Sequence, residues 1–128
     1  MVWTSDAGPG VFLRIDDLKA HGGDSNAVLN LREVTAYDKD GKVIAPLTTR
    51  LSSEHSSGSN SVGNCHDGKI DDKICHSATA DDNPSLVFGY RAGANISKIV
   101  VTNRAFKSVQ EIRIVGASIR ICSDSGPH

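Results

Sequence analysis

The chain has 128 residues, of which 38% are hydrophobic and 23% charged, the size and composition of one soluble globular domain. Its formal net charge of −1 gives no general attraction to nucleic acid, and no apolar run approaches the roughly 20 residues that span a bilayer. We therefore expect a single domain over 1–128, with neither nucleic-acid binding nor membrane insertion among its functions.

The two ends of the chain have the composition of linkers. Residues 1–10 lack the basic start and apolar centre of a secretory signal. Ser5–Gly10 and Ser123–His128 are rich in Gly, Pro and Ser, which favour turns and loops. We place the folded core at about 11–121, with linker-like flanks at 1–10 and 123–128, and expect neighbouring domains of a larger polypeptide.

Short apolar and alternating runs predict strands in the first half of the chain. Val11–Ile15 is an apolar run interrupted only by Arg14. After a polar loop, Asp38–Gly41 forms a turn signal between two further strands, Leu29–Tyr37 and Lys42–Ala45, which predicts a hairpin. The first of these strands alternates strictly, so one of its faces is expected to carry Leu29, Leu31, Glu33, Thr35 and Tyr37.

Strand patterns also dominate the second half. Residues 54–63 are so rich in Ser, Gly and Asn that we expect a loop there, whereas Ser85–Tyr90 is apolar enough for a strand. Ile96–Asn103 and Glu111–Ile121 combine Ile and Val with interleaved polar residues, which is typical of core strands. Only Ala105–Gln110 leaves room for a short helical turn. The predicted class is all-β, a sandwich of two antiparallel sheets.

The segment Asn64–Ser77 concentrates the residues that carry chemistry. Its two cysteines, Cys65 and Cys75, are close enough in sequence to be joined across a short loop, which would indicate an oxidising compartment. Two reduced, buried thiols are the alternative. Because three cysteines cannot all pair within one chain, Cys122 is expected to be unpaired.

The same segment offers two interpretations as a metal site. Asn64, Asp67, Asp71 and Asp72 present the hard oxygen ligands that calcium prefers, although Asx-type turns and solvated carboxylates would use the same residues. A zinc site would need Cys65, His66, Cys75 and His76. Zinc is disfavoured because adjacent Cys-His pairs cannot easily direct both side chains at one tetrahedral ion.

Catalytic signatures are missing from the sequence. It contains no G-x-S-x-G, HExxH or P-loop motif. Triads assemble from distant positions, so this observation is weaker than a positive motif would be. We expect a protein that is not an enzyme.

Several motifs follow one another in a characteristic order: VFLRI at 11–15, LNLREVTAYDKDGKVI at 29–44, LSSEHSSGSNSVGNCHDGKIDD at 51–72, CHS at 75–77 and IVVTNR at 99–104. Their order resembles the galactose-binding-like superfamily of β-sandwich modules, also called discoidin domains, and in particular its fucolectin-related branch. This resemblance implies a jelly-roll sandwich. It also implies a structural calcium ion held by the carbonyls of Asn64 and Lys69, the carboxylate of Asp67 and Glu33 from the Glu-Val strand.

The resemblance also implies a sugar site, with departures from the family pattern. His76 matches a histidine that follows the calcium loop and faces outward, Arg104 matches a first arginine, and Arg113 is a displaced second one. Phe106 stands where the family has an aspartate, and could offer an aromatic face to a sugar ring. The Glu-Val strand comes near the beginning, whereas it usually closes such domains. The alternative is that the arginines are solvated strand-end charges and that His76 caps the loop.

These expectations combine into one function with one rival. The first is a non-catalytic carbohydrate-binding, lectin-like or cell-adhesion module at an extracellular, cell-surface or virion location, binding a cell-surface glycan or polysaccharide weakly per site and through avidity. The rival is a structural or assembly domain of a larger surface or virion protein that has lost the sugar site, as Phe106 and the displaced Arg113 suggest.

Overall fold

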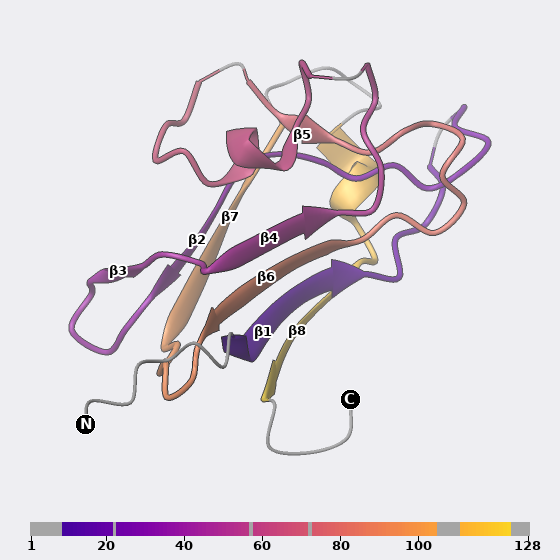
Figure 1. Cartoon of the computed structure of the whole chain (residues 1–128). Coiled ribbons are helices and arrows are strands. Elements are labelled where there is room, and N and C mark those ends of the chain that lie inside the picture. Colours follow the sequence, from indigo (N-terminus) through magenta and orange to yellow (C-terminus); the bar gives the residue numbers. More distant parts are fainter. Residues whose placement is uncertain (1–8, 22, 57, 72, 105–110, 124–128) are drawn as a thin grey trace.

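The alternating segments of the chain form two antiparallel sheets that face each other (Figure 1). The structure is a computed structural model and describes residues 9–21, 23–56, 58–71, 73–104 and 111–123. One sheet has the order β4-β6-β1-β8, in which each neighbouring pair is antiparallel. Its strands are β1 (Pro9–Asp16), β4 (Thr48–Leu51), β6 (Leu86–Arg91) and β8 (Ser118–Ser123). The predicted all-β sandwich is confirmed at this level.

The second sheet is organised around β2 (Asn30–Tyr37). Along one edge of β2 lies β7 (Lys98–Asn103), and along the other lie two very short strands, β3 (Val43–Ile44) and β5 (Cys75–His76). Ala36 pairs with both β3 and β7, and Leu31 pairs with both β5 and β7, which places β3 and β5 on the same edge. Between them the edge of β2 at residues 32–35 has no strand partner among the described residues.

A β-bulge interrupts the pairing of β2 with β7. Leu31 pairs with Asn103 and Glu33 with the preceding Thr102, so Arg32 is one extra residue on β2. Because side chains alternate with a period of two, one extra residue moves all later side chains to the opposite face. Accordingly Leu29, Leu31, Val34 and Ala36 belong to the core. The prediction that Glu33, Thr35 and Tyr37 share a face with Leu29 and Leu31 is therefore wrong.

The hairpin predicted at Asp38–Gly41 is present, and its turn chemistry is visible. The Asp38 carboxylate Oδ1 accepts hydrogen bonds from the backbone N–H groups of Asp40 and Lys42, each at 2.9 Å. Gly41 has φ +80°, a left-handed conformation that glycine adopts without a Cβ penalty. The side chain of one aspartate and the freedom of one glycine thus set the connection between β2 and β3.

The core lies between the sheets and draws on both. Full burial of each large apolar side chain contributes roughly 1.5–3 kcal/mol relative to exposure, so this cluster is the main source of stability. Its buried members are Leu13, Ile15, Leu29, Leu31, Val34, Ala36, Ile44, Cys65, Cys75, Leu86, Phe88 and Tyr90.

The prediction of a core strand over 111–121 is wrong in two respects. Residues Glu111–Ile114 form a 3-10 helix, η2, and Gly116 at φ +89° turns the chain before β8 begins. The strand that follows is at the edge of its sheet, and Ile119 and Ile121 are 47% and 46% exposed. Isoleucine and valine content therefore identified a strand but not its place in the fold.

The remaining predicted elements lie close to their expected positions. The strands expected at 11–15, 29–37, 42–45, 85–90 and 96–103 are present with shifted ends, and a second 3-10 helix, η1 (Val62–Cys65), begins within the loop expected at 54–63. Of the flanks, residues 9–10 belong to β1 and 123 to β8, whereas 1–8 and 124–128 lie outside the described residues, as does the turn expected at Ala105–Gln110. Within the described ranges, no helix is both long and apolar enough to cross a membrane.

Candidate functional site

A disulfide joins the two cysteines of the segment 64–77, as predicted. Cys65 is the last residue of η1 and Cys75 the first of β5; their Cα atoms are 5.4 Å apart and both residues are fully buried in the core. Because each sulfur is bonded to the other, neither is available as a thiolate, which removes two of the four ligands of the zinc interpretation. Cys122 is a free cysteine, also as predicted.

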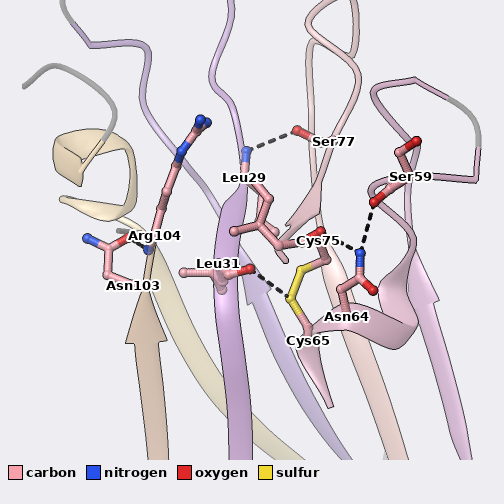
Figure 2. Close-up of a disulfide and its surroundings, with 10 residues drawn as sticks. Leu29, Leu31, Ser59, Asn64, Cys65, Cys75, Ser77, Asn103 and Arg104 are labelled. Atoms are coloured by element: carbon pink, nitrogen blue, oxygen red, sulfur yellow. Dashed lines mark hydrogen bonds between the residues drawn. A yellow bond between two sulfur atoms is a disulfide. The ribbon is translucent and has the colours of Figure 1, made fainter. Parts of the chain in front are cut away.

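Polar side chains fix the backbone on both sides of this disulfide (Figure 2). The Asn64 amide Nδ2 donates to the carbonyls of Ser59 at 3.0 Å and Ile74 at 2.9 Å. The Ser77 hydroxyl accepts the Leu29 N–H at 2.9 Å, and the Ser77 N–H donates to the Leu29 carbonyl at 2.8 Å. The segment is thus attached to β2 and to the 55–60 loop by specific bonds.

We call the predicted calcium ligands Glu33, Asn64, Asp67 and Lys69 the carboxylate cluster. Glu33 is 5% exposed, and its Oε2 accepts the Gly68 N–H at 2.9 Å. Its Oε1 is buried with no hydrogen-bond partner in the part of the chain that the structure describes. Burial raises the pKa of Glu33. The hydrogen bond from the Gly68 N–H opposes part of this rise, and the neighbouring Asp67 charge adds a smaller increase.

The turn of the carboxylate cluster has the alternative form considered from the sequence. Asp67 Oδ1 accepts the Lys69 N–H at 2.9 Å, which is an Asx-type turn around Gly68, at φ +78°. This turn and a bound cation are compatible, because the turn uses one oxygen of Asp67 and leaves the other. The donor chemistry fits a hard cation through Glu33 Oε1 and Asp67, and calcium at this cluster remains a prediction.

A cavity of about 330 Å³ lies beside Glu33, where the edge of β2 is not paired with a strand. Loop 66–70 covers part of this edge. The cavity is lined by Glu33, Val34, Thr35, Tyr37, Val43, Ile44, Ala45, Pro46, His66, Gly68, Ile70 and Tyr90. The unpaired edge of β2 between β3 and β5 therefore borders a cavity that reaches Glu33, a member of the carboxylate cluster.

A second group, which we call the arginine–histidine cluster, consists of His55, His76, Arg104 and Arg113. His76 pairs with Asn30 across β5 and β2, while Arg104 directly follows Asn103, the partner of Leu31 on β7. In antiparallel pairing this places Arg104 on the β7 side of Asn30 and His76 on the β5 side. The predicted sugar residues His76 and Arg104 therefore flank one position of β2.

The loop that follows β4 brings His55 to this cluster. The His55 N–H donates to the His76 carbonyl at 2.8 Å, and the two imidazole rings lie 4.7 Å apart at 31°. His55 is exposed, whereas His76 is only 6% exposed and its Nδ1 lies 2.7 Å from the Ser77 carbonyl. The expectation that His76 faces outward is therefore wrong, and His55 is the histidine at the surface.

Arg113 joins the cluster from η2 and is itself held by an acidic residue. Its Nε and Nη2 bond the two carboxylate oxygens of Asp24 at 2.8 and 2.9 Å. Arg104 differs, because its guanidinium has neither a hydrogen bond nor an ion pair with any described residue. Figure 2 shows its side chain extending beyond the end of β7.

Electrostatic coupling between these groups appears in their pKa values. Burial lowers the pKa of His76, and the charges of His55, Arg113 and Arg104 lower it further, against the raising effect of the Ser77 carbonyl. Burial and the charge of Arg113 also lower the pKa of Arg104. The basic groups of the cluster are thus close enough for each positive charge to disfavour protonation of its neighbours.

The sequence analysis missed three contributors to this site. Asn30 is 2% exposed, and both atoms of its amide group lack a hydrogen-bond partner among the residues described. His55 lies in a Ser-rich loop and Asp24 in a polar one, so neither has a local signal. Asn30 had one, as a polar residue between two leucines. Phe106, the remaining predicted sugar residue, and Asp72 lie outside the described residues.

Comparisons with protein-family models, with curated proteins and with solved structures give no match. Function is therefore argued from the carboxylate cluster and the arginine–histidine cluster.

Proposed function

We propose that the protein is a non-catalytic carbohydrate-binding or adhesion module with a galactose-binding-like, jelly-roll sandwich. The observation that carries the proposal is the convergence of His76 from β5, Arg104 from just after β7 and Arg113 from η2 at one end of β2. Sugar hydroxyls both donate and accept at fixed angles, so planar and charged donors on rigid elements suit their recognition.

The members of the cluster differ in what they can offer a sugar. Arg104, whose guanidinium has no partner among the residues that the structure describes, and the exposed His55 are the groups available for direct contact. Arg113 is committed to Asp24 and His76 is buried, so both position the others through packing and charge. Direct contact therefore falls to Arg104 and His55.

A structural calcium ion at the carboxylate cluster is the second part of the proposal. It is supported by the buried Glu33 Oε1, which lacks a partner within the described residues, and by the carboxylate of Asp67 nearby. Hard cations need several oxygens, and the carbonyls of Asn64 and Lys69 are the further ligands we assign. When bound, calcium would neutralise the two adjacent carboxylates and fix the 64–69 loop.

A disulfide in a domain of this size is typical of proteins that mature in an oxidising compartment, so we place the module outside the cell, on a cell surface or on a virion. Affinity per site would be weak, with avidity from neighbouring modules.

A glycan array tests the sugar proposal, with the protein displayed in multivalent form and calcium present. We expect saccharide binding by the parent protein and its loss in Arg104→Ala and His55→Ala. Arg50→Ala is the matched control, because Arg50 is an exposed arginine on β4 of the other sheet. Failure of the parent protein to bind any saccharide would reject the proposal, and an equal loss in Arg50→Ala would reject the site.

A structural or assembly domain is the second candidate function. It is favoured by three apolar side chains at the edge formed by η2 and β8, namely Val115, Ile119 and Ile121, which are 57%, 47% and 46% exposed. Apolar groups that gather on a surface mark interaction sites more often than isolated ones do. Self-association or partner binding by a parent protein that binds no saccharide, and loss of that association in Ile119→Ser together with Ile121→Ser, would identify this role.

A further inference from the structure

We propose that the arginine–histidine cluster selects acidic saccharides, those that carry a carboxylate or a sulfate, over their neutral counterparts. This inference rests on the proposed function and names the ligand class of the same site.

The balance of charges around the cluster is the first argument. Among the described side chains, the carboxylate that contacts the cluster is that of Asp24, and both of its oxygens are bonded to Arg113. No described carboxylate contacts the Arg104 guanidinium, although Arg113 and His76 are close enough to interact with it electrostatically. A ligand that brings one negative charge would complete this arrangement, whereas a neutral sugar would leave the two guanidinium groups repelling each other.

The geometry of the strands is the second argument. Asn30 and His76 belong to the paired strands β2 and β5, and Arg104 directly follows the last residue of β7, so the three lie in a row across the end of β2. Such positions are rigid, and rigid donors lose less entropy on binding. Arg104 therefore presents its donors from a fixed base at the end of β7.

The buried amide of Asn30 is the third argument. A polar side chain that is 2% exposed and lacks partners among the described residues is costly unless a water or ligand completes its bonds. Because Asn30 lies between Arg104 and His76, a water or ligand that completed its hydrogen bonds would be bound at this cluster. The site is therefore polar beneath as well as at its surface.

The chemistry of the guanidinium favours an acidic group over a hydroxyl. A carboxylate or sulfate accepts two parallel N–H bonds from the planar fork of an arginine, and such charge-assisted bonds are roughly twice as strong as neutral ones. We expect a preference of roughly tenfold for the acidic sugar.

Two sugars that differ at one carbon test this inference. We would measure binding of immobilised oligogalacturonate and of the matched neutral oligogalactose, with galactose 6-sulfate as a third probe. The parent protein should bind the acidic probes roughly tenfold more tightly, and this preference should shrink in 0.5 M salt, where screening is strong. Comparison of the carboxylate with the sulfate identifies which acidic group the site prefers.

Variants locate the preference. Arg104→Gln should bring acidic and neutral probes to equal affinity, Arg104→Lys should retain part of the difference because it keeps a charge without the planar fork, and Arg50→Gln should behave as the parent. Thermal unfolding of each variant establishes that it is folded.

The outcomes separate this inference from the proposed function. Equal binding of acidic and neutral probes by the parent would overturn the inference and leave the function standing. No binding of any saccharide would overturn both. An acidic preference that persists in folded Arg104→Gln would overturn the assignment to this cluster.

Discussion

Arg113 and Asp24, which are 89 positions apart in sequence, form a bidentate ion pair. The distance from Nε to Oδ2 is 2.8 Å, and that from Nη2 to Oδ1 is 2.9 Å. Their side chains are 10% and 19% exposed, so the pair is largely shielded from solvent. It connects η2 to the loop between β1 and β2, and fixes the direction of the Arg113 guanidinium within the arginine–histidine cluster.

Asp24→Asn should lower the free energy of unfolding by about 1–3 kcal/mol, because a largely buried guanidinium loses its counter-charge while remaining in place. Urea unfolding followed by circular dichroism measures the change. Asp82→Asn is the matched control, since Asp82 is exposed, and it should unfold as the parent does. Equal midpoints for both variants would show that the ion pair contributes nothing to stability.

Glu33→Gln should have effects of opposite sign with and without calcium. A raised folded pKa means that this carboxyl favours the folded state below its ordinary pKa, and that the contribution is lost as pH rises through the folded value. At pH 7 without calcium the charged group is therefore unfavourable, and the variant should melt at the same or a higher temperature than the parent.

With calcium added the order should reverse, because an ion that binds only the folded state stabilises the parent by mass action. Chelator should cancel that gain. Glu54→Gln, which changes an exposed glutamate, should respond to calcium as the parent does. A parent melting temperature that is unmoved by saturating calcium would contradict the calcium proposal.

His76 should make the protein less stable as pH falls below neutrality. Its folded pKa is lower than the ordinary value of 6.5, so the unfolded chain binds a proton more readily than the folded one. This contribution is fully present above about pH 6.5 and is lost as pH falls toward the folded value. Urea midpoints between pH 7.5 and 4.5 should show a smaller decline in His76→Gln. The same series on His66→Gln shows whether another histidine causes the decline.

Replacing both Cys65 and Cys75 by serine should lower the free energy of unfolding by about 2–3 kcal/mol. The bridge closes a loop with a sequence separation of 10. Without this cross-link the unfolded chain has more conformational entropy, which stabilises the unfolded state by about 2–3 kcal/mol. Cys122→Ser should change stability little, because this thiol is not cross-linked. Thiol titration of the unfolded parent should find one free thiol, and three would contradict the disulfide.

The local features of the fold were accessible from the sequence. The turn at Asp38 is set by its own side chain and by Gly41, and the disulfide joins neighbours in sequence, so both follow from short segments. The prediction of one strand over 111–121 was wrong, because the Ile and Val content of this segment was given more weight than Gly116, the residue that marked a turn.

The composition of the site was only partly accessible. Arg104, Arg113 and His76 were identified through a resemblance, but their partners Asp24 and His55 are brought to the site by tertiary packing that no local pattern encodes. The burial of His76 has the same origin, because the 55–60 loop pairs along the outer edge of β5.

The bulge at Arg32 determines which side chains of β2 face the core after Leu31. If β2 paired with β7 without this bulge, plain alternation from Leu31 would turn Glu33 and Thr35 inward and Val34 and Ala36 outward. An apolar face would be exchanged for a carboxylate, and Gly68 would lose the acceptor that holds its loop. The bulge, as much as the identity of the residues, therefore determines that the chain has both a dry interior and a carboxylate beside the cavity.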